Sequence, residues 1–147
     1  MISLATAKKL KRAGLQWQPA LLDFFAIPNR QMDEKIFVIS DMLVTVDVLQ
    51  GMQVVSFQGA SEWALDSLVT RETVWLPREE QLRLALEAAL LAAGRPELQF
   101  TSGLGGYRCT IQVHDRVLTF DASDASEAYA AALLYLLRRT SAGTGAP

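Results

Sequence analysis

The spacing of apolar residues along the chain predicts three long helices and one short one. Apolar positions recur at helical intervals over residues 4–13, 79–93 and 124–139, with a shorter stretch at 61–68. Ser3 and Gly14 bracket the first of these, and Gly94 follows the second, as expected of residues that cap helices. Asp124 with Glu127 has the spacing of a capping pair, which places the start of the last helix there.

Short apolar runs between turn residues predict strands. The candidates are residues 24–27, 35–39, 53–57, 72–76, 98–100, 107–113 and 117–120. Residues 41–50 are ambiguous, although Val44, Val46 and Val48 alternate as in a strand. Turn chemistry at residues 28–31 predicts a hairpin, and the last three candidates predict a meander with turns at 102–106 and 114–116. The expected fold class is therefore α+β, an antiparallel sheet with three to four helices packed mainly on one face.

Length and composition fit one compact domain. The chain has 147 residues, of which 50% are hydrophobic, and it contains no internal repeat and no linker. We therefore expect a single domain over residues 1–139. Residues 140–147 are small and polar with two glycines, and we expect a disordered tail there.

The net charge and the numbers of Cys and His exclude several classes of binding site. The chain has 14 Lys+Arg against 16 Asp+Glu, a net charge of -2, so the molecule as a whole is no general polyanion binder. One Cys and one His exclude a disulfide framework, a cysteine-based zinc site and paired-histidine metal motifs. We expect no cofactor and no bound metal.

The N-terminus and the longest apolar run bear on location. Apolar residues precede basic ones at the N-terminus, which is the reverse of the order in a signal peptide. Residues 128–137 form the longest apolar run, and at ~1.5 Å per residue they reach roughly 15 Å, half of the ~30 Å hydrocarbon layer. We expect no membrane span and a cytoplasmic location.

Two features resemble catalytic motifs without matching them. The glycine-rich segment 103–106 lacks the pattern of a phosphate-binding loop and precedes a strand, so a hairpin turn is the better interpretation. Cys109 and His114 are five residues apart, and in a regular strand they point to opposite faces. A buried thiol and a turn imidazole are therefore expected, not a nucleophile and its base.

Paired carboxylates leave one enzymatic alternative open. Asp33 and Glu34 are neighbours, as are Glu79 and Glu80. Such pairs can perform acid/base chemistry when a cleft raises the pKa of one of them. Acids at the start of a helix more often interact with its dipole in solvent. An enzyme with a carboxylate-only site is thus the second alternative function.

The N-terminal segment carries a local positive charge. Residues 1–14 contain no acid and four basic residues, a local charge of +4 that leaves -6 on the remainder. Such asymmetry permits contact with nucleic acid, and Trp17 is close enough in sequence to stack on a base. The first alternative function is therefore a nucleic-acid-binding accessory protein. Its contact residues would be Lys8, Lys9, Lys11, Arg12 and Trp17.

The last predicted helix is apolar on every side. Residues 128–137 contain no polar residue, so the helix is either surrounded by neighbours or meets another subunit. The helix at 79–93 adds a second broad apolar surface. Both outcomes stay open: the helices bury each other, or they form a homodimer, which we predict. The expected interface consists of Ala130, Leu134, Leu137, Leu84 and Leu91.

Three segments carry a resemblance to known proteins. They are residues 2–11, 74–82 (Val-Trp-Leu-Pro-Arg-Glu-Glu-Gln-Leu) and 125–137. Together they resemble a group of small bacterial and phage α+β proteins of unknown function, some carried under a pilus-assembly label. The ATPase known by that label has a phosphate loop that this chain lacks. The shared motifs are architectural, so the resemblance implies no catalytic residues, and Arg78 stands where a capping Ser or Thr is expected.

The sequence therefore predicts a non-enzymatic protein-interaction module, a homodimer in the cytoplasm that also binds an unidentified protein partner. Apolar helix surface and aromatic residues near Trp17 or Trp63 would supply the contacts.

Overall fold

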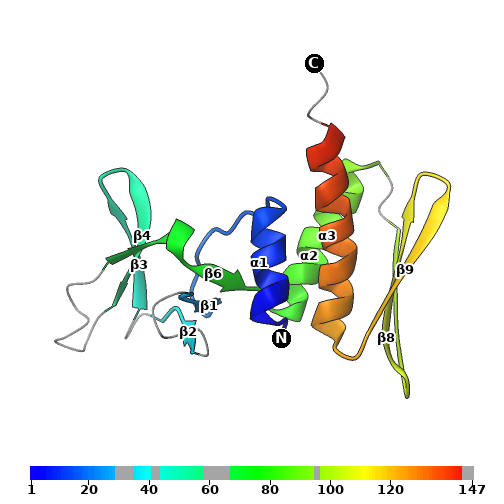
Figure 1. Ribbon diagram of the computed structural model, residues 1–147, viewed down its shortest axis with the longest axis horizontal. Helices are drawn as coiled ribbons and strands as arrows, with labels where there is room; N and C mark the ends of the chain where they lie inside the picture. Colours follow the sequence, from blue (N-terminus) through cyan, green and yellow to red (C-terminus); the bar gives the residue numbers. More distant parts are fainter. Residues whose placement is uncertain (29–34, 41–43, 58–66, 95–96, 144–147) are drawn as a thin grey trace. The chain divides into compact units, whose positions relative to one another are not determined.

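The chain folds into two compact units. The computed structural model describes residues 1–28, 35–40, 44–57, 67–94 and 97–143 (Figure 1). Unit 1 combines Met1–Leu15 with Pro77–Pro147, and unit 2 is Gln16–Leu76. In the sequence, unit 2 thus interrupts unit 1, while the single domain expected over residues 1–139 stays a prediction. The later boundary falls at Pro77, whose ring cannot donate a hydrogen bond to continue the preceding strand.

In the part of unit 1 that the structure describes there are three helices and one sheet. Its elements are α1 (Leu4–Arg12), α2 (Glu79–Ala92), β7 (Leu98–Gly103), β8 (Gly106–Val113), β9 (Arg116–Ala122) and α3 (Ala125–Gly143). The sheet is antiparallel in the order β7-β8-β9, so the predicted meander is confirmed. Helix α3 packs on β8 and β9, and α1 and α2 pack against α3 (Figure 1).

The helix boundaries follow from the capping residues. Ser3 Oγ accepts a hydrogen bond from the Thr6 backbone N–H, and Gly14 ends α1 in the left-handed region with φ of 96°. Arg78 has no side-chain oxygen that could accept a hydrogen bond from the first turn of α2. Of the two hydrogen bonds of a capping box, the structure forms the one in which the side chain of the third helical residue bonds to the backbone of the capping residue. The Arg78 backbone N–H donates to Gln81 Oε1 at 2.9 Å.

The meander alternates between a helix-facing and an open face. On β8, Cys109, Ile111 and Val113 are buried on the side that α3 covers. The opposite face is polar, and there Arg108 Nε donates to Asp121 Oδ1 of β9 at 2.7 Å. Buried alanines at 128, 130 and 132 keep the α3 side chains short where the helix is enclosed by its neighbours. The strand period therefore gives the sheet one face for the core of unit 1 and one for solvent.

The described residues of unit 2 form two small antiparallel sheets. Strands β1 (Phe24–Ala26), β2 (Ile36–Val38) and β6 (Val74–Leu76) form one in the order β2-β1-β6. Strands β3 (Val44–Leu49), β4 (Met52–Phe57) and β5 (Ser67–Val69) form the other in the order β3-β4-β5, and η1 (Thr70–Glu72) is a single 3-10 turn. The buried cluster consists of Phe25, Ile27, Ile39 and Val55, with Trp17, Phe37 and Val46 packed against it.

The α+β class is confirmed, but the expected sheet is wrong in detail. Instead of one sheet, the described residues form three three-stranded antiparallel sheets, because β6 returns to pair with β1 while the meander stays in unit 1. That the helices pack mainly on one face is not confirmed: α3 packs on β8 and β9, and α1 and α2 pack on α3. Helix α3 continues to Gly143, so residues 140–143 of the expected tail are helical. The helix expected at 61–68 lies mostly outside the described residues, and its last two positions belong to β5.

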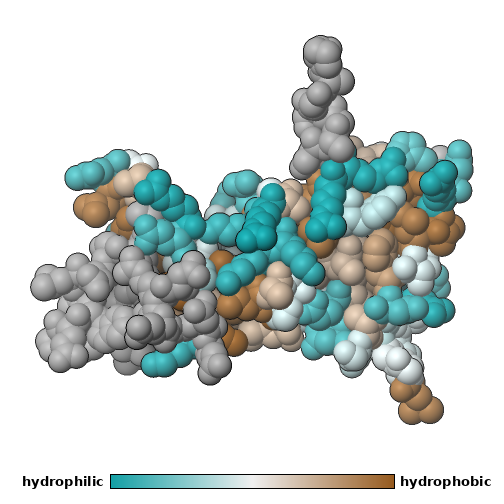
Figure 2. All heavy atoms as spheres, in the orientation of Figure 1, coloured by the Kyte–Doolittle hydropathy of each residue, from teal (hydrophilic) through white to brown (hydrophobic). Residues whose placement is uncertain are grey.

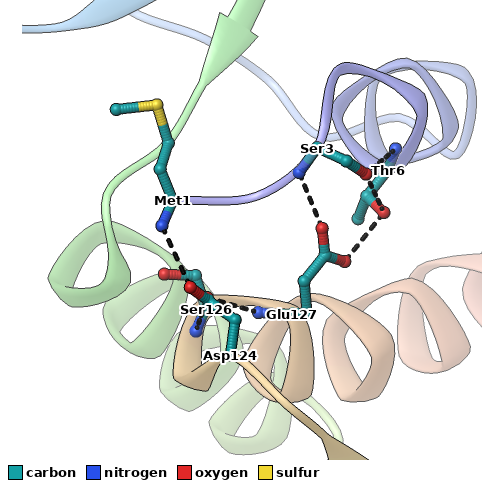
Figure 3. Close-up of polar contacts among 6 residues, drawn as sticks. All are labelled: Met1, Ser3, Thr6, Asp124, Ser126 and Glu127. Atoms are coloured by element: carbon teal, nitrogen blue, oxygen red, sulfur yellow. Dashed lines mark hydrogen bonds and ion pairs between the residues drawn. The ribbon is translucent and has the colours of Figure 1, made fainter.

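Helix α1 is fastened to the start of α3 by a carboxylate cluster (Figure 3). Glu127 Oε1 accepts the Ser3 backbone N–H at 2.6 Å, and Oε2 accepts the Thr6 hydroxyl at 2.8 Å. Asp124 caps α3 by accepting the Ser126 backbone N–H at 2.8 Å, and the Met1 ammonium lies 3.4 Å from its other oxygen. The predicted capping pair is therefore half right: Asp124 caps α3, whereas Glu127 reaches across to α1.

The surroundings of Asp124 also act on its acidity. Desolvation favours the neutral form, but the Ser126 backbone hydrogen bond and the Met1 ammonium together outweigh it and lower the pKa of Asp124 below its usual value.

Replacing Glu127 should loosen α1. We expect Glu127→Ala to lower the free energy of unfolding by about 1–2 kcal/mol, because it removes the acceptors for both the Ser3 N–H and the Thr6 hydroxyl. Thr6→Val removes the hydroxyl that donates to Glu127 and accepts from the Ser3 hydroxyl, with little change of shape, and should also lower the free energy of unfolding by about 1 kcal/mol. Chemical denaturation measures both, and equal stability of Glu127→Ala and the unmodified protein would contradict the assigned role.

Gly106 should tolerate no side chain, whereas its neighbour Gly105 should. Gly106 has φ of 117°, and a Cβ there would lie 2.6 Å from the Ala122 carbonyl oxygen. We expect Gly106→Ala to lower the free energy of unfolding by about 2–3 kcal/mol. Gly105→Ala is the matched control, since its Cβ would meet nothing within 4 Å. Similar stabilities for the two variants would show that the β7–β8 turn relaxes freely.

Candidate protein-binding surface

Helix α3 is enclosed by its own chain. Helices α1 and α2 pack on it, and strands β8 and β9 cover another side (Figure 1). Leu133 is 1% exposed and Leu136 is 6% exposed, while Leu134 and Leu137 stay half-buried. The all-round apolarity of residues 128–137 is therefore explained within unit 1. Of the two outcomes left open by the sequence, the helices burying each other is the one that this packing favours for α3.

The five predicted interface residues separate into three groups. Ala130 is fully buried, so it has no exposed surface to offer a partner. Leu134 and Leu137 offer part of their surface. Leu84 and Leu91 of α2 are 50% and 67% exposed and are the most accessible of the five. The structure thus moves the candidate surface from α3 to α2.

The exposed face of α2 carries a continuous apolar stripe. Leu82, Leu86 and Leu90 are fully buried, so the helix already presents one apolar side to the core of unit 1. Leu84, Ala88 and Leu91 are exposed at i, i+4 and i+7, which is the spacing of a second stripe on one helix face. We call Leu84, Ala88 and Leu91 the α2 stripe.

A shallow hollow lies along the α2 stripe. Leu84, Glu87, Ala88 and Leu91 line it together with Leu98 at the start of β7, and its volume is about 460 Å³. Glu87 stands at its border, held by Arg83, whose Nη1 donates to Glu87 Oε1 at 2.6 Å. An apolar floor with an ion pair at its rim has the general layout of a protein-binding surface.

The rest of the visible surface is more mixed. Figure 2 shows hydrophilic and hydrophobic residues interspersed over the face of unit 1 that it presents. In the β7–β8 turn, Leu104 is fully exposed. It is a single leucine flanked by glycines, so it forms no stripe or hollow of its own.

The predicted nucleic-acid contacts are divided between the two units. Lys9, Lys11 and Arg12 lie in the last turn of α1, where basic side chains interact favourably with the helix dipole. Trp17 belongs to unit 2, and its Nε1 donates to Asp23 Oδ2 at 2.9 Å. Its ring stacks on that of Trp75 with 6.3 Å between centroids. The indole is thus engaged in the packing of unit 2, and stacking on a base would require it to leave these contacts.

Asp23 is the buried carboxylate that sequence reasoning missed. It is 1% exposed and accepts hydrogen bonds from Trp17 Nε1 and the Ala20 backbone N–H. No nearby acid or motif marks it in the sequence, although its place just before an apolar strand is compatible with burial. Because its oxygens hold the segment that leads into β1, its role here is structural.

The other chemical candidates are dispersed. Glu79 and Glu80 are exposed in the first turn of α2, while Asp33, Glu34 and Trp63 lie outside the described residues. Among the described residues, no three His, Cys, Asp or Glu side chains are grouped so that they could hold a metal ion. Within the same part of the chain, none of the helices combines the length and apolarity needed to cross a membrane.

Cys109 and His114 occupy different environments. Cys109 is fully buried in β8, and burial raises the pKa of its thiol to about 11. His114 is exposed in the β8–β9 turn with φ of 56°. The thiol is therefore protonated at neutral pH and shielded from solvent, which agrees with its interpretation as a core residue.

The Cys109 thiol should react slowly in the folded protein. At neutral pH a rise of the pKa from 9.0 to about 11 lowers the thiolate fraction ~100-fold, and burial slows access further. Alkylation followed by mass spectrometry should thus be at least ~100-fold slower in buffer than in denaturant. Equal rates in the two conditions would show an accessible, activated thiol.

Comparison with known proteins adds no relative. Neither protein-family models, nor curated proteins, nor solved structures give a match to this chain. The resemblance to small bacterial and phage proteins therefore stays a prediction. The proposed function rests on the surface of unit 1.

Proposed function

We propose that the protein is a non-enzymatic protein-interaction module that forms a homodimer through the α2 stripe. The observation that carries this proposal is the exposure of Leu84 and Leu91 on a helix whose opposite side is already buried. A helix with one core-facing stripe needs no second one for the stability of its own unit. Apolar side chains that gather in a row beside a hollow are typical of surfaces that a partner covers.

The composition of the stripe also supports protein binding over small-molecule binding. The hollow is open and shallow, and its floor is aliphatic, with one carboxylate at the border. Small-molecule sites are enclosed clefts in which several polar groups converge to orient the ligand. A long aliphatic row instead suits the apolar face of another helix, since two such faces bury each other along their length.

The polar side chains that could take part in catalysis have structural roles, which supports a non-enzymatic function. Asp124 and Glu127 cap α3 and fasten α1, Asp23 holds a loop in unit 2, and Cys109 is a buried neutral thiol. Each of these side chains forms hydrogen bonds or packing contacts that stabilise the fold. We therefore propose that the protein functions through its surface and not through a reactive side chain.

Charges placed in the α2 stripe should separate the dimer. We expect Leu84→Glu and Leu91→Glu each to raise the dissociation constant at least tenfold, because a carboxylate would be desolvated at the interface without a partner. Both positions are exposed in the subunit, so the circular dichroism spectrum should be preserved, whereas the unfolding midpoint should fall by the stabilisation that dimerisation supplies. Light scattering at micromolar concentration measures the mass.

Leu104→Glu is the matched control, because it places the same charge on a fully exposed leucine at the tip of the β7–β8 hairpin. This variant should remain a dimer. A monomer mass for the unmodified protein at micromolar concentration would overturn the homodimer, and loss of the dimer in Leu104→Glu alone would place the interface elsewhere.

A further inference from the structure

A hollow of about 330 Å³ lies between the β8–β9 turn and the last turns of α3, at one end of unit 1 (Figure 1). It is lined by Val113, His114, Asp115 and Arg116 of the hairpin and by Arg139 of the helix. Two guanidinium groups and the one imidazole of the chain thus come from two elements to the same place. Polar groups that converge on a hollow of this size are typical of a small-molecule site.

Arg139 is held in place by aromatic side chains. Its Nη1 donates to the Tyr135 hydroxyl at 2.9 Å, and its Cζ lies 5.7 Å from the centroid of the Tyr135 ring. Tyr135 in turn packs on Phe120 of β9, with 5.9 Å between ring centroids. A guanidinium group has five N–H donors, and within the described residues Arg139 uses one of them, on Tyr135. Its other donors are therefore available to a ligand, and a side chain that is already positioned loses less entropy on binding.

The end of the hairpin presents two further donor groups. Arg116 begins β9 directly opposite Val113, and His114 and Asp115 are the two turn residues between them. The Gln112 side chain donates to the His114 carbonyl oxygen at 3.4 Å and so supports the turn. In the part of the chain that the structure describes, neither the Arg116 guanidinium nor the His114 imidazole has a hydrogen-bond or ion-pair partner. Both groups can therefore bind an acceptor in the hollow.

His114 occupies a turn position that favours glycine. Its φ is 56°, in the left-handed region, where a side chain with a Cβ is held at a cost in free energy. Glycine adopts this conformation without that cost, so the turn itself gives no reason for a histidine. An imidazole that lines the hollow and can donate a hydrogen bond there supplies such a reason.

The donors of this lining suit an anion. We infer that the hollow binds a phosphoryl group, as inorganic phosphate or as the monoester of a small molecule, through Arg116, Arg139 and His114. The planar guanidinium group presents parallel N–H donors that match two oxygens of one phosphoryl group. A phosphomonoester carries a charge of about -1.5 to -2 at pH 7, so two guanidinium groups stabilise it more than they stabilise a singly charged carboxylate.

The site is independent of the proposed dimer. It shares no lining residue with the hollow beside the α2 stripe, and it adds a ligand to the proposed function. Asp115 is the one acid of the lining, and its carboxylate opposes an anion. The site therefore predicts that removing this charge strengthens binding, which a purely structural turn would not show.

Titration of the intact protein at constant ionic strength tests the site. The probes are inorganic phosphate, glycerol 2-phosphate and acetate, and backbone amide NMR spectra record which residues respond. We expect saturable shifts at residues 113–116 and around residue 139 with both phosphates. Tighter binding of glycerol 2-phosphate identifies a monoester as the ligand, and tighter binding of inorganic phosphate identifies the free ion. No saturable shift with either phosphate, or acetate bound as tightly as both, would overturn the inference.

Substitutions assign the binding to the hollow. Arg116→Gln and Arg139→Gln should each raise the dissociation constant about tenfold, because each removes charge-assisted hydrogen bonds. Arg138→Gln is the matched control, since it removes the same charge from the adjacent position of α3, which does not line the hollow. Its dissociation constant should stay within about twofold of the unmodified protein's, because salt screens a charge that makes no contact. An equal loss in Arg138→Gln and Arg139→Gln would show an unspecific charge effect and overturn the site.

The turn residues give opposite signs that separate binding from folding. Asp115→Asn should lower the dissociation constant for phosphate. His114→Gly should raise it and at the same time raise the unfolding midpoint, because glycine relieves the left-handed conformation. A histidine without a role in binding would show the higher midpoint alone, and that result would remove His114 from the site.

Discussion

The enclosure of α3 is the constraint on which the rest of unit 1 depends. This helix has apolar side chains around its circumference, and its packing covers most of them, although Leu134 and Leu137 stay half-buried. The sheet covers it through β8 and β9, and α1 and α2 cover other sides. Because α2 turns its Leu82, Leu86 and Leu90 toward the core, its second row of leucines is left outside. The candidate binding surface on α2 therefore results from the way in which α2 packs on α3.

The local signals in the sequence predicted much of the secondary structure because they act over a few residues. Ser3, Gly14 and Gly94 marked helix boundaries correctly, and the alternation in residues 107–113 identified both the strand and its buried face. The pairing of β6 with β1 was missed because it joins residues about fifty positions apart, and no residue type records that choice. The same limit hid the division into two units, since Pro77 ends a strand whether or not a unit ends with it.

The candidate site was predicted only in part, because apolar periodicity does not show what a residue faces. Apolar periodicity identified Leu84 and Leu91 but also Ala130, and periodicity cannot tell a stripe that faces a neighbouring helix from one that faces solvent. Glu127 shows the same limit for polar residues. Its spacing from Asp124 predicts a local cap, yet its carboxylate bonds to Ser3 and Thr6 at the far end of the sequence. In both cases the deciding partner is distant along the chain.

The interrupted layout of unit 1 has a consequence for how the chain is made. Helix α1 is synthesised before unit 2, whereas α3, the helix to which α1 is fastened, is synthesised after unit 2. Unit 2 is complete well before that and can fold while α1 waits. A nine-residue helix is marginal in water by itself, so α1 gains its stability only after α3 has been synthesised. Helix α1 can therefore reach its native packing only after unit 2 has been synthesised, although α1 precedes unit 2 in the sequence.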